Sequence, residues 1–426
     1  MLIEFSVANF RSFRERQTLS LVATQAKELA SRNTFSTKIK SIPPLLRSAA
    51  IFGPNAGGKT NLFRALHFMQ QTVLTSAAAG QLGQTLNVKP FALSRKTRHS
   101  PSEFEIKFIQ DGVLYEYGLA CTESAIVREW LVAYPSGRPQ RWFDRSYSDR
   151  TKKTIWTIGT KLKGPQKLWR DATRPNALFL STAVHLNNEQ LKPIFNWFQE
   201  NLIVVVPGVE LNPYLTFDLA AKEDGKSIIM QFLNAADLGI SDILVKREPF
   251  NPNPLATQQS PIVRGQVFVT SPGTLEAISA RTFHKEVDGK AFVDWDYTEE
   301  SNGTQKFFRS VGGWHKVLSL GTTVCIDELD SSLHPKIVRF LIDLFQSSET
   351  NKHNAQLIFN THDTSILSND VFRRDQIWFA EKSRLQSTKL YSLSEFSPRK
   401  GEAFGKHYLS GRYGALPVLG EVALNG

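Results

Sequence analysis

Residues 51–62 read IFGPNAGGKTNL, and GPNAGGKT within them matches the pattern G-x-x-x-x-G-K-[ST] from Gly53 to Thr60. The preceding residues, RSAAIFG, are typical of a buried strand that ends in glycine. The following residues, TNLFRALHFMQQTV, place Leu62, Leu66 and Met69 on one face of a helix. This order of strand, glycine-rich turn and helix is the context that a phosphate-binding loop requires.

The loop predicts an ATP site with a magnesium ion. Glycines let the backbone curl so that successive N–H groups face phosphate oxygens, and the helix N-terminus adds its positive end. Lys59 is expected to bridge the β and γ phosphates, and Thr60 to offer its hydroxyl to Mg²⁺. The predicted ATP-binding residues of the loop are Gly53, Pro54, Asn55, Ala56, Gly57, Gly58, Lys59, Thr60 and Asn61.

A second motif is the apolar run TTVCIDE, residues 322–328, which ends in two adjacent carboxylates. Asp327 is predicted to hold Mg²⁺ through water, and Glu328 to orient or deprotonate the attacking water. Taken alone, an acidic pair after a strand is more often a helix cap or a solvated edge. The functional interpretation therefore depends on the motifs around it.

Strands and helices alternate from Lys316 onward, in the runs TTVCIDE, PKIVRFLIDLFQ, AQLIFNTHD and DQIWFAEK. This alternation predicts an α/β fold with a parallel sheet covered on both faces. The expected P-loop core is split between residues 1–75 and 300–395. Residues 76–299 form an inserted lobe of strands and helices, with hairpins at Asp111-Gly112 and Asp288-Gly289, and residues 396–426 form a C-terminal tail.

Composition indicates an ordinary globular protein. The chain has 426 residues, of which 41% are hydrophobic and 21% charged. It contains no apolar run of about 18 residues and no signal-peptide pattern at its start, so we expect a cytoplasmic protein that does not cross a membrane. Cys121 and Cys325 lie in different predicted strands, which excludes a disulfide framework or a cysteine-based zinc site.

The formal net charge of +11 is unevenly distributed. From Arg138 to Arg174, eleven Lys or Arg stand against three Asp, a net charge of +8. Trp142, Trp156 and Trp169 are interspersed, and cations with aromatic side chains can hold phosphates and bases. The segment is a candidate site for nucleic acid or an acidic protein, and equally a solvated face of the lobe.

Three more stretches complete a motif set: ESNGTQK (300–306), LDSSLHP (329–335) and LIFNTHD (357–363). Their order with the loop and the acidic pair is that of the ABC-type ATPases of the SMC, RecF and OLD group. ESNGTQK resembles the signature motif of that group, LDSSLHP its D-loop and FNTHD its His switch. FSVANFRSFRERQTLSLVA, PSEFEIKFIQDGVLYEYGL and KHYLSGRYGALP further resemble the RloA-like (AbiLi-like) AAA-family ATPases of bacterial anti-phage defence.

The resemblance implies a mechanism that needs two copies. ATP in the P-loop of one copy is completed by Ser301 and Gly303 of the other, and Asp330 lies on the dimer seam. His362 senses the γ phosphate within its own copy, so the catalytic set is Glu328, His362 and Lys59. The Q-loop glutamine of the group has no clear equivalent, since Gln70 and Gln71 lie on the P-loop helix.

The function implied is a sensor or scaffold of an abortive-infection system. It would form a homodimer or higher homo-oligomer around ATP and control a separately encoded toxin or Toprim-like nuclease. The 240 residues between Thr60 and Ser301 lack heptads, so no long coiled coil is expected, and the 64 residues after His362 lack a D-x-D nuclease motif. A RecF-like DNA-repair ATPase and a nucleotide-gated scaffold with little turnover stay open as alternatives.

Overall fold

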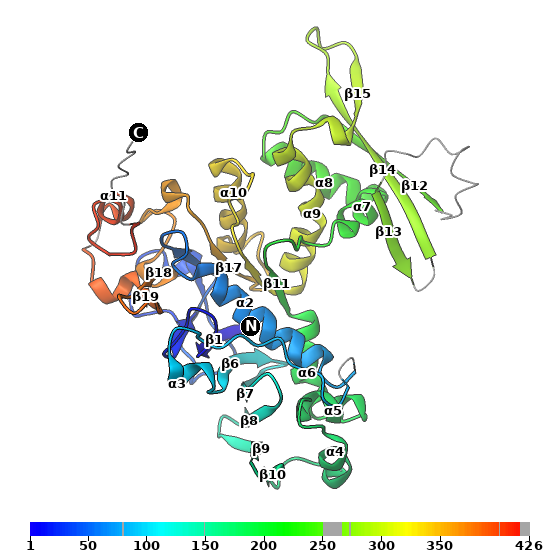
Figure 1. Ribbon diagram of the computed structural model, residues 1–426. Helices are drawn as coiled ribbons and strands as arrows, with labels where there is room; N and C mark the ends of the chain where they lie inside the picture. Colours follow the sequence, from blue (N-terminus) through cyan, green and yellow to red (C-terminus); the bar gives the residue numbers. More distant parts are fainter. Residues whose placement is uncertain (79–80, 149, 250–265, 272–273, 400, 418–426) are drawn as a thin grey trace, which may run out of the picture. The chain divides into compact units, whose positions relative to one another are not determined.

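The computed structural model describes residues 1–78, 81–148, 150–249, 266–271, 274–399 and 401–417. The chain divides into two compact units (Figure 1). The first unit comprises Met1–Pro207, Leu320–Leu329 and Ile342–Gly426, and the second comprises Gly208–Ser319 and Asp330–Leu341. Among the described residues, no helix combines the length and apolar composition that crossing a membrane requires.

The first unit contains a six-stranded sheet with the order β11-β16-β17-β5-β18-β19. Its first five strands are parallel, and β19 runs antiparallel to β18. Every residue of β5, β16 and β17 is buried, as the predicted parallel sheet requires. The strands are β5 (Ser48–Phe52), β11 (Leu202–Val205), β16 (Thr323–Ile326), β17 (Gln356–Asn360), β18 (Ile377–Lys382) and β19 (Thr388–Ser392).

A seven-stranded sheet with the order β10-β9-β8-β7-β6-β1-β2 forms the other layer of this unit. The predicted hairpin at Asp111-Gly112 is confirmed, and both residues have positive φ, 51° and 76°, as a tight turn of this hand needs. The strands are β1 (Leu2–Ala8), β2 (Gln17–Ser20), β6 (Ser102–Gln110), β7 (Val113–Cys121), β8 (Ile126–Tyr134), β9 (Gln140–Ser148) and β10 (Lys153–Ile158).

Helix α2 (Lys59–Thr75) joins the two sheets into one core. Leu62, Leu66 and Met69 are buried on it, as their spacing predicts. Gln70 is also buried, and its amide donates to the carbonyl oxygens of Phe198 and Leu202 at 2.8 and 2.7 Å. Gln70 therefore connects α2 to the end of α6 (Lys192–Glu200) and the start of β11, so its role is structural.

The observed units differ from the predicted domain boundaries. Residues 76–207 belong to the first unit, because β6 to β10 continue the sheet that begins with β1. Residues 300–319, predicted to be part of the core, belong to the second unit. Hydrogen bonds between strands far apart in the sequence set these boundaries, and local composition does not report them.

The second unit combines helices with a small sheet. Strand β14 (Thr274–Lys285) pairs with β12 (Asp242–Pro249), β13 (Gln266–Ser271) and β15 (Phe292–Asp296), which confirms the predicted hairpin around Asp288-Gly289. Its helices include α7 (Tyr214–Ala220), α8 (Glu223–Ala235) and α9 (Asn302–Leu320). At 19 residues α9 is the longest helix that the structure describes, so the expected absence of a long coiled coil is confirmed for this part of the chain.

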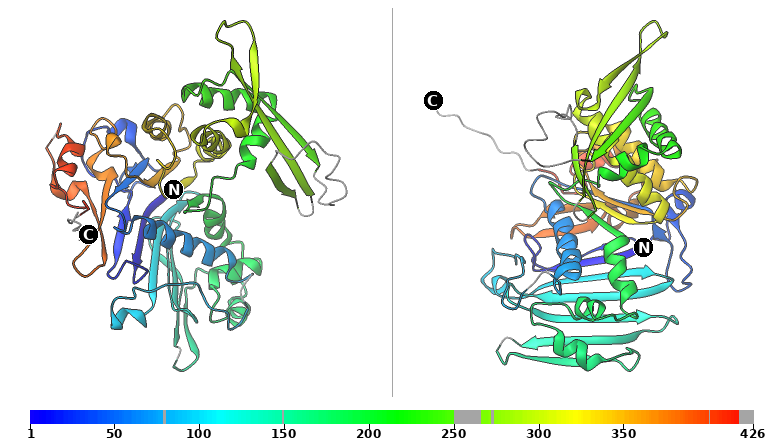
Figure 2. Two further views of the ribbon diagram at one scale, coloured as in Figure 1. Left: turned by 45° about the horizontal axis from the view of Figure 1, so that its top comes forward. Right: turned by 90° about the vertical axis from the view of Figure 1, so that its right-hand side faces the viewer.

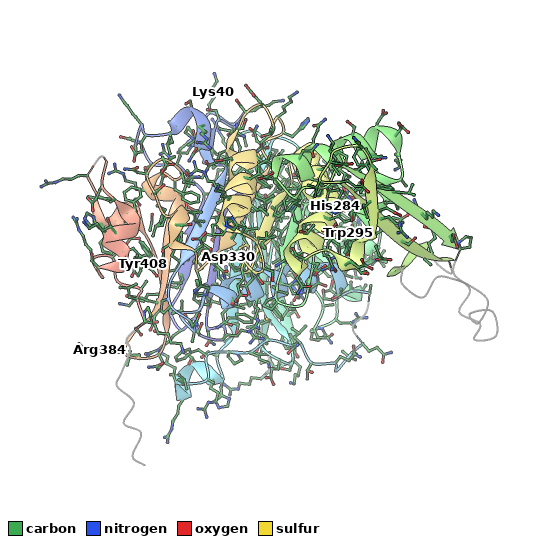
Figure 3. The ribbon with its side chains drawn as sticks, turned by 90° about the horizontal axis from the view of Figure 1, so that it is seen from above. Lys40, His284, Trp295, Asp330, Arg384 and Tyr408 are labelled. Carbon is green, nitrogen blue, oxygen red and sulfur yellow. The ribbon has the colours of Figure 1, made fainter. Side chains whose placement is uncertain are left out.

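The predicted C-terminal tail folds back on the first unit as far as the structure describes it; residues 418–426 lie outside the described range. Tyr408 of α11 (Phe404–Leu409) stacks on Phe379 of β18 at 5.3 Å, and Figure 3 labels it. The Tyr413 hydroxyl donates to Glu402 at 2.6 Å, and this bond, with others, lowers the pKa of Glu402 to about 2.

Strands β8 and β9 contain a fully buried ion pair. The Glu129 carboxylate accepts hydrogen bonds from the Arg145 Nε at 2.8 Å and the Tyr117 hydroxyl at 3.0 Å. It also accepts from the backbone N–H groups of Phe179 and Leu180. Arg145 is 1% exposed and Glu129 is 0% exposed. Four donors around one carboxylate offset the cost of removing it from water.

We predict that Glu129→Gln lowers the free energy of unfolding by about 3 kcal/mol, since it leaves the Arg145 charge buried without a carboxylate. The matched control is Asp144→Asn, which removes the same charge from the pair with Arg128 on the same two strands. Arg128 is half exposed, so the expected loss there is below about 1 kcal/mol. Urea unfolding measures both, and equal losses would contradict this account of the pair.

Candidate functional site

The turn after β5 forms a loop with three glycine positions that leave no room for a side chain. Gly53 and Gly58 have positive φ values of 146° and 108°. A Cβ at Gly53 would collide with the carbonyl oxygen of Ala380, and one at Gly57 would lie 2.6 Å from the same atom. A Cβ at Gly58 would collide with Thr388, so the glycines are needed for close approach to β18 and β19.

The loop surrounds the buried ammonium group of Lys59. This group donates to the carbonyl oxygens of Gly53 at 2.7 Å and Pro54 at 3.0 Å. At the start of α2, the N–H groups of Asn61 and Leu62 donate to the Gly58 carbonyl oxygen at 3.0 and 3.3 Å, and the N-terminus is the positive end of the helix dipole. The arrangement offers a lysine and a helix N-terminus to an anion, as a phosphate site requires.

The parallel sheet brings the acidic strand beside this loop. Ile326 pairs with Phe359, so the residues that follow, Asp327 and Asn360, are neighbours. The Thr60 hydroxyl donates to Asp327 Oδ1 at 3.1 Å, and the Asn360 amide donates to the same oxygen. Asp327 Oδ2 is buried and has no hydrogen-bond partner.

Burial raises the pKa of Asp327, while the bonds from Asn360 and Thr60 oppose the rise. A buried carboxylate oxygen without a partner, next to a threonine hydroxyl, is suited to a hard cation or its water ligand. Thr60 and Asp327 thus fit Mg²⁺, as the sequence predicts. Among the residues that the structure describes, no group of three or more His, Cys, Asp or Glu could hold a metal ion by itself, so other ligands would be water and phosphate.

Glu328 adopts a left-handed backbone conformation with φ 55°, which is unfavourable for a residue with a side chain. Its N–H donates to Asn360 Oδ1 at 2.6 Å. Asn360, which is 0% exposed, therefore fixes both carboxylate residues through the two ends of one amide. The exposed Glu328 side chain lines the same cavity as the loop.

This cavity has a volume of about 430 Å³. It brings together the predicted Lys59, Glu328 and His362, of which the first and last are 303 positions apart in the sequence. Its lining is Ser12, Pro54, Asn55, Ala56, Gly57, Gly58, Lys59, Thr60, Asn61, Arg64, Pro207, Glu328, His362 and Lys382. No glutamine is among these residues, so the structure supplies no Q-loop equivalent in this cavity.

The site includes several residues to which the sequence motifs assign no role of their own. Ser12 accepts from the Asn61 amide at 2.8 Å and contacts the Thr388 hydroxyl at 2.8 Å, which links the N-terminal segment to the loop. Lys382 ends β18, and Asn360 ends β17. For Lys382 and Asn360, the sequence signal was their position at the end of a predicted strand, because the carboxyl ends of parallel strands share one edge of the sheet.

The remaining predicted residues lie in the second unit. Ser301 caps α9, since its hydroxyl accepts from the Thr304 N–H at 3.2 Å. A Cβ at Gly303 would lie 2.8 Å from the carbonyl oxygen of Ser332, and Lys306 donates to the Ser331 carbonyl oxygen at 2.5 Å. The start of α9 thus packs against the segment that begins at Asp330, which Figure 3 labels.

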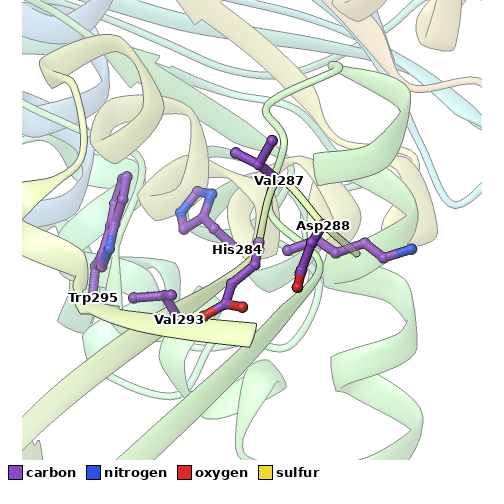
Figure 4. A pocket seen from close by; sticks show the side chains of 7 residues that line it. His284, Val287, Asp288, Val293 and Trp295 are labelled. Carbon is purple, nitrogen blue, oxygen red and sulfur yellow. The ribbon is translucent and has the colours of Figure 1, made fainter. Parts of the chain in front are cut away.

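Two other hollows lack this chemistry. One of about 490 Å³ lies at the β14–β15 hairpin and is lined by His284 and Trp295 (Figure 4), whose rings stack at 4.3 Å. His284 also contacts Glu300 at 2.7 Å. The other, of about 730 Å³, lies between residues 85–100 and the ends of β6 and β7. Neither places a carboxylate pair beside a glycine-rich loop, so the cavity at Lys59 is the candidate site.

The glycine-rich loop, the buried lysine and the Thr60–Asp327 contact define a P-loop nucleotide-binding protein with an α/β fold. Residues 48–368 match the family described as "AAA domain, putative AbiEii toxin, Type IV TA system". This range covers more than half of the chain, and the protein belongs to that family. Its nucleotide-binding, AAA-type character is thereby established.

The chain is similar to solved structures that include the following two. A structure of the SmcHead bound to the C-winged helix domain of ScpA has 14% identity and a TM-score of 0.43, covering 92% of this chain and 97% of that one. The SMC head domain from Thermotoga maritima has 13% identity and a TM-score of 0.39, covering 92% and 98%. No curated protein matches the sequence.

We predict that Asn360→Asp destabilises the protein in a pH-dependent way. The new carboxylate lies against Asp327, so one of the two must keep a proton and its pKa rises. A raised carboxyl pKa gives stability that is present at low pH and is lost as pH rises through the folded-state value. Thermal unfolding should show a larger deficit relative to the wild type at pH 8 than at pH 5.

The control is Asn360→Ala, which removes both amide bonds without adding charge. It should cost about 1–3 kcal/mol, with a smaller dependence on pH than in the aspartate variant, because losing the Asn360 bond raises the pKa of Asp327 without adding a second carboxylate. A pH-independent deficit in the aspartate variant would contradict the placement of Asn360 against Asp327.

Proposed function

We propose that this protein is a cytoplasmic, ABC-type ATPase of the RloA-like kind, which dimerises around Mg·ATP and hydrolyses it. The observation that carries the proposal is the Thr60–Asp327 contact with its partnerless carboxylate oxygen, beside the cavity that Thr60, Lys59 and Glu328 line. These groups would supply a cation site, a phosphate site and a base next to one another.

Each residue of the site has its own role in the proposed reaction. Lys59 and the N–H groups that start α2 bind the phosphates, and Thr60 with Asp327 holds Mg²⁺. When bound, Mg²⁺ neutralises charge on the phosphate oxygens. Glu328 orients a water and takes its proton, and His362, which lines the same cavity, senses the γ phosphate.

Dimerisation is proposed from the order of the motifs, which resembles that of ATPases whose nucleotide site is completed by a second copy. In the proposed dimer these residues of the second copy complete the γ-phosphate site, with Asp330 on the seam. The packing of the start of α9 on the segment after Asp330 supports a shared surface for the two motifs. ATP would then hold two copies together, and hydrolysis would release them.

The biological role proposed is that of a sensor or scaffold in an anti-phage, abortive-infection system. The family description names a toxin–antitoxin system, which supports this setting. The ATPase cycle would control a separately encoded toxin or Toprim-like nuclease. Co-purification of the product of the neighbouring reading frame tests this part, and recovery of a recombination protein instead would favour a RecF-like repair ATPase.

We predict that Glu328→Gln lowers the turnover rate for ATP by about 100-fold or more while nucleotide binding persists, because the amide keeps the size of the side chain but cannot accept a proton. An ATP-bound dimer should accumulate, as measured by light scattering after size exclusion. Glu349→Gln, at an exposed glutamate, is the control for the loss of one charge. Normal turnover in the Glu328 variant would exclude the base role.

Lys59→Ala should abolish both ATP binding and ATP-dependent dimerisation, since it removes the cation at the phosphates. Isothermal titration and the same light-scattering measurement check this. An ATP-dependent dimer that persists in this variant would contradict the nucleotide-bridged assembly. Fewer than one turnover per wild-type chain, with dimerisation intact, would favour a nucleotide-gated scaffold.

A further inference from the structure

The segment from Arg138 to Arg174 forms one end of the antiparallel sheet of the first unit, where β9, β10 and α4 (Gln166–Ala172) lie together (Figures 1 and 2). The three tryptophans of this segment are not surface platforms. Trp142 is 5% and Trp169 is 3% exposed. Trp156 is half-buried and packs edge-on against Phe179 at 5.1 Å. They belong to the core, which corrects the expectation that they would lie beside the cations at the surface.

Most of the cations, in contrast, remain at the surface. Arg145 is paired with the buried Glu129, as described above. Seven other cations of the segment are exposed and make no ion pair with a carboxylate of the described chain. These are Arg138, Arg141, Arg150, Lys153, Lys161, Lys163 and Lys167, which we call the cationic edge.

The cations gather at the two ends of the β9–β10 pair. At one end, a Cβ at Gly159 would collide with the Arg141 carbonyl oxygen, and the Gly159 N–H donates to the Trp142 carbonyl oxygen at 2.9 Å. The loop carrying Lys161 and Lys163 therefore follows directly beside Arg141. At the other end, Lys153 is opposite Ser148, next to the turn that contains Arg150.

The distance between the cations at the two ends of β10 indicates that their ligand is extended. The six residues of β10 span about 20 Å at about 3.3 Å per residue. One strand of duplex DNA places a phosphate about every 3.4 Å along the helix axis, so this distance covers about six phosphates. A small anion could contact only one group of cations, whereas an extended polyanion could contact both.

Protection of an exposed strand edge explains only part of this charge. Strand β10 is the edge of its sheet, and a lysine such as Lys153 discourages pairing with another chain. The cations on the loop after β10 and on α4 do not lie on the edge strand. Their charge therefore calls for a separate explanation.

We propose that the cationic edge binds the phosphate backbone of duplex nucleic acid without reading its sequence. Single strands are usually held by stacking bases on exposed aromatic rings, and the tryptophans here are packed inside. Protein interfaces centre on aromatic and apolar side chains, whereas only Ile155 and Leu168 are exposed large apolar residues in the described part of this segment. A backbone contact by Lys and Arg needs neither feature.

The test is binding of the full-length protein to a fluorescently labelled 25-base-pair duplex, followed by anisotropy at 50 and 200 mM KCl. Wild-type affinity should fall at least about tenfold over this range, because each neutralised phosphate releases counterions. Lys161→Glu with Lys163→Glu should weaken binding at 50 mM at least about tenfold and flatten the salt dependence.

The matched control is Lys38→Glu with Lys40→Glu, which reverses two exposed lysines with the same spacing elsewhere in the first unit (Lys40 is labelled in Figure 3). It should change affinity by less than about twofold, since these lysines lie outside the cationic edge. Thermal unfolding checks that both variants fold, and Lys161→Gln with Lys163→Gln repeats the test without reversing charge.

Three outcomes would overturn the proposal. The first is no binding of duplex at 50 mM KCl, and the second is an equal loss in the edge and control variants. The third is preference for another polyanion: tighter binding of a single strand of equal length, or displacement of the duplex by polyglutamate at equal charge, which would indicate an acidic protein. None of these measurements requires ATP hydrolysis, so the result stands apart from the proposed ATPase cycle.

Discussion

The hydrogen bond between Thr60 and Asp327 joins residues 267 positions apart, and the site depends on it. It can form only because β5 and β16 both lie beside β17 in a parallel sheet, with their carboxyl ends at one edge. The strand order therefore places the phosphate loop, Glu328 and His362 around one cavity. The antiparallel sheet and α2 complete the core that keeps this edge in register.

Asp327 and Glu328 are each in an unfavourable state that the surrounding structure stabilises. Asp327 is buried with an oxygen that lacks a partner, and burial raises its pKa. Glu328 keeps a left-handed backbone that costs of order 1–3 kcal/mol for a residue with a side chain. Asn360 stabilises both residues with a single amide, so an asparagine of the FNTHD stretch positions the acidic pair.

The basic side chains also fall into two groups: those with a structural role in the core and those exposed at the surface. Arg145 and Arg128 both stand on neighbouring strands with carboxylate partners, yet one is enclosed by the core and the other is half exposed. The seven cations of the cationic edge have no such partners and face solvent. Net charge counted along the sequence treats all of them alike, although only the exposed ones can meet a ligand.

The sequence by itself determined the phosphate loop, the acidic strand, both predicted hairpins and the buried parallel strands. These features depend on local patterns: glycines where backbone approaches backbone, alternation of side chains, and unbroken apolar runs. Only the tertiary structure decided that residues 76–207 extend the first unit, that Gln70 and the tryptophans are internal, and that Asn360 lies against Asp327. Pairing between distant strands and burial of side chains control those outcomes, and neither leaves a local signature in the chain.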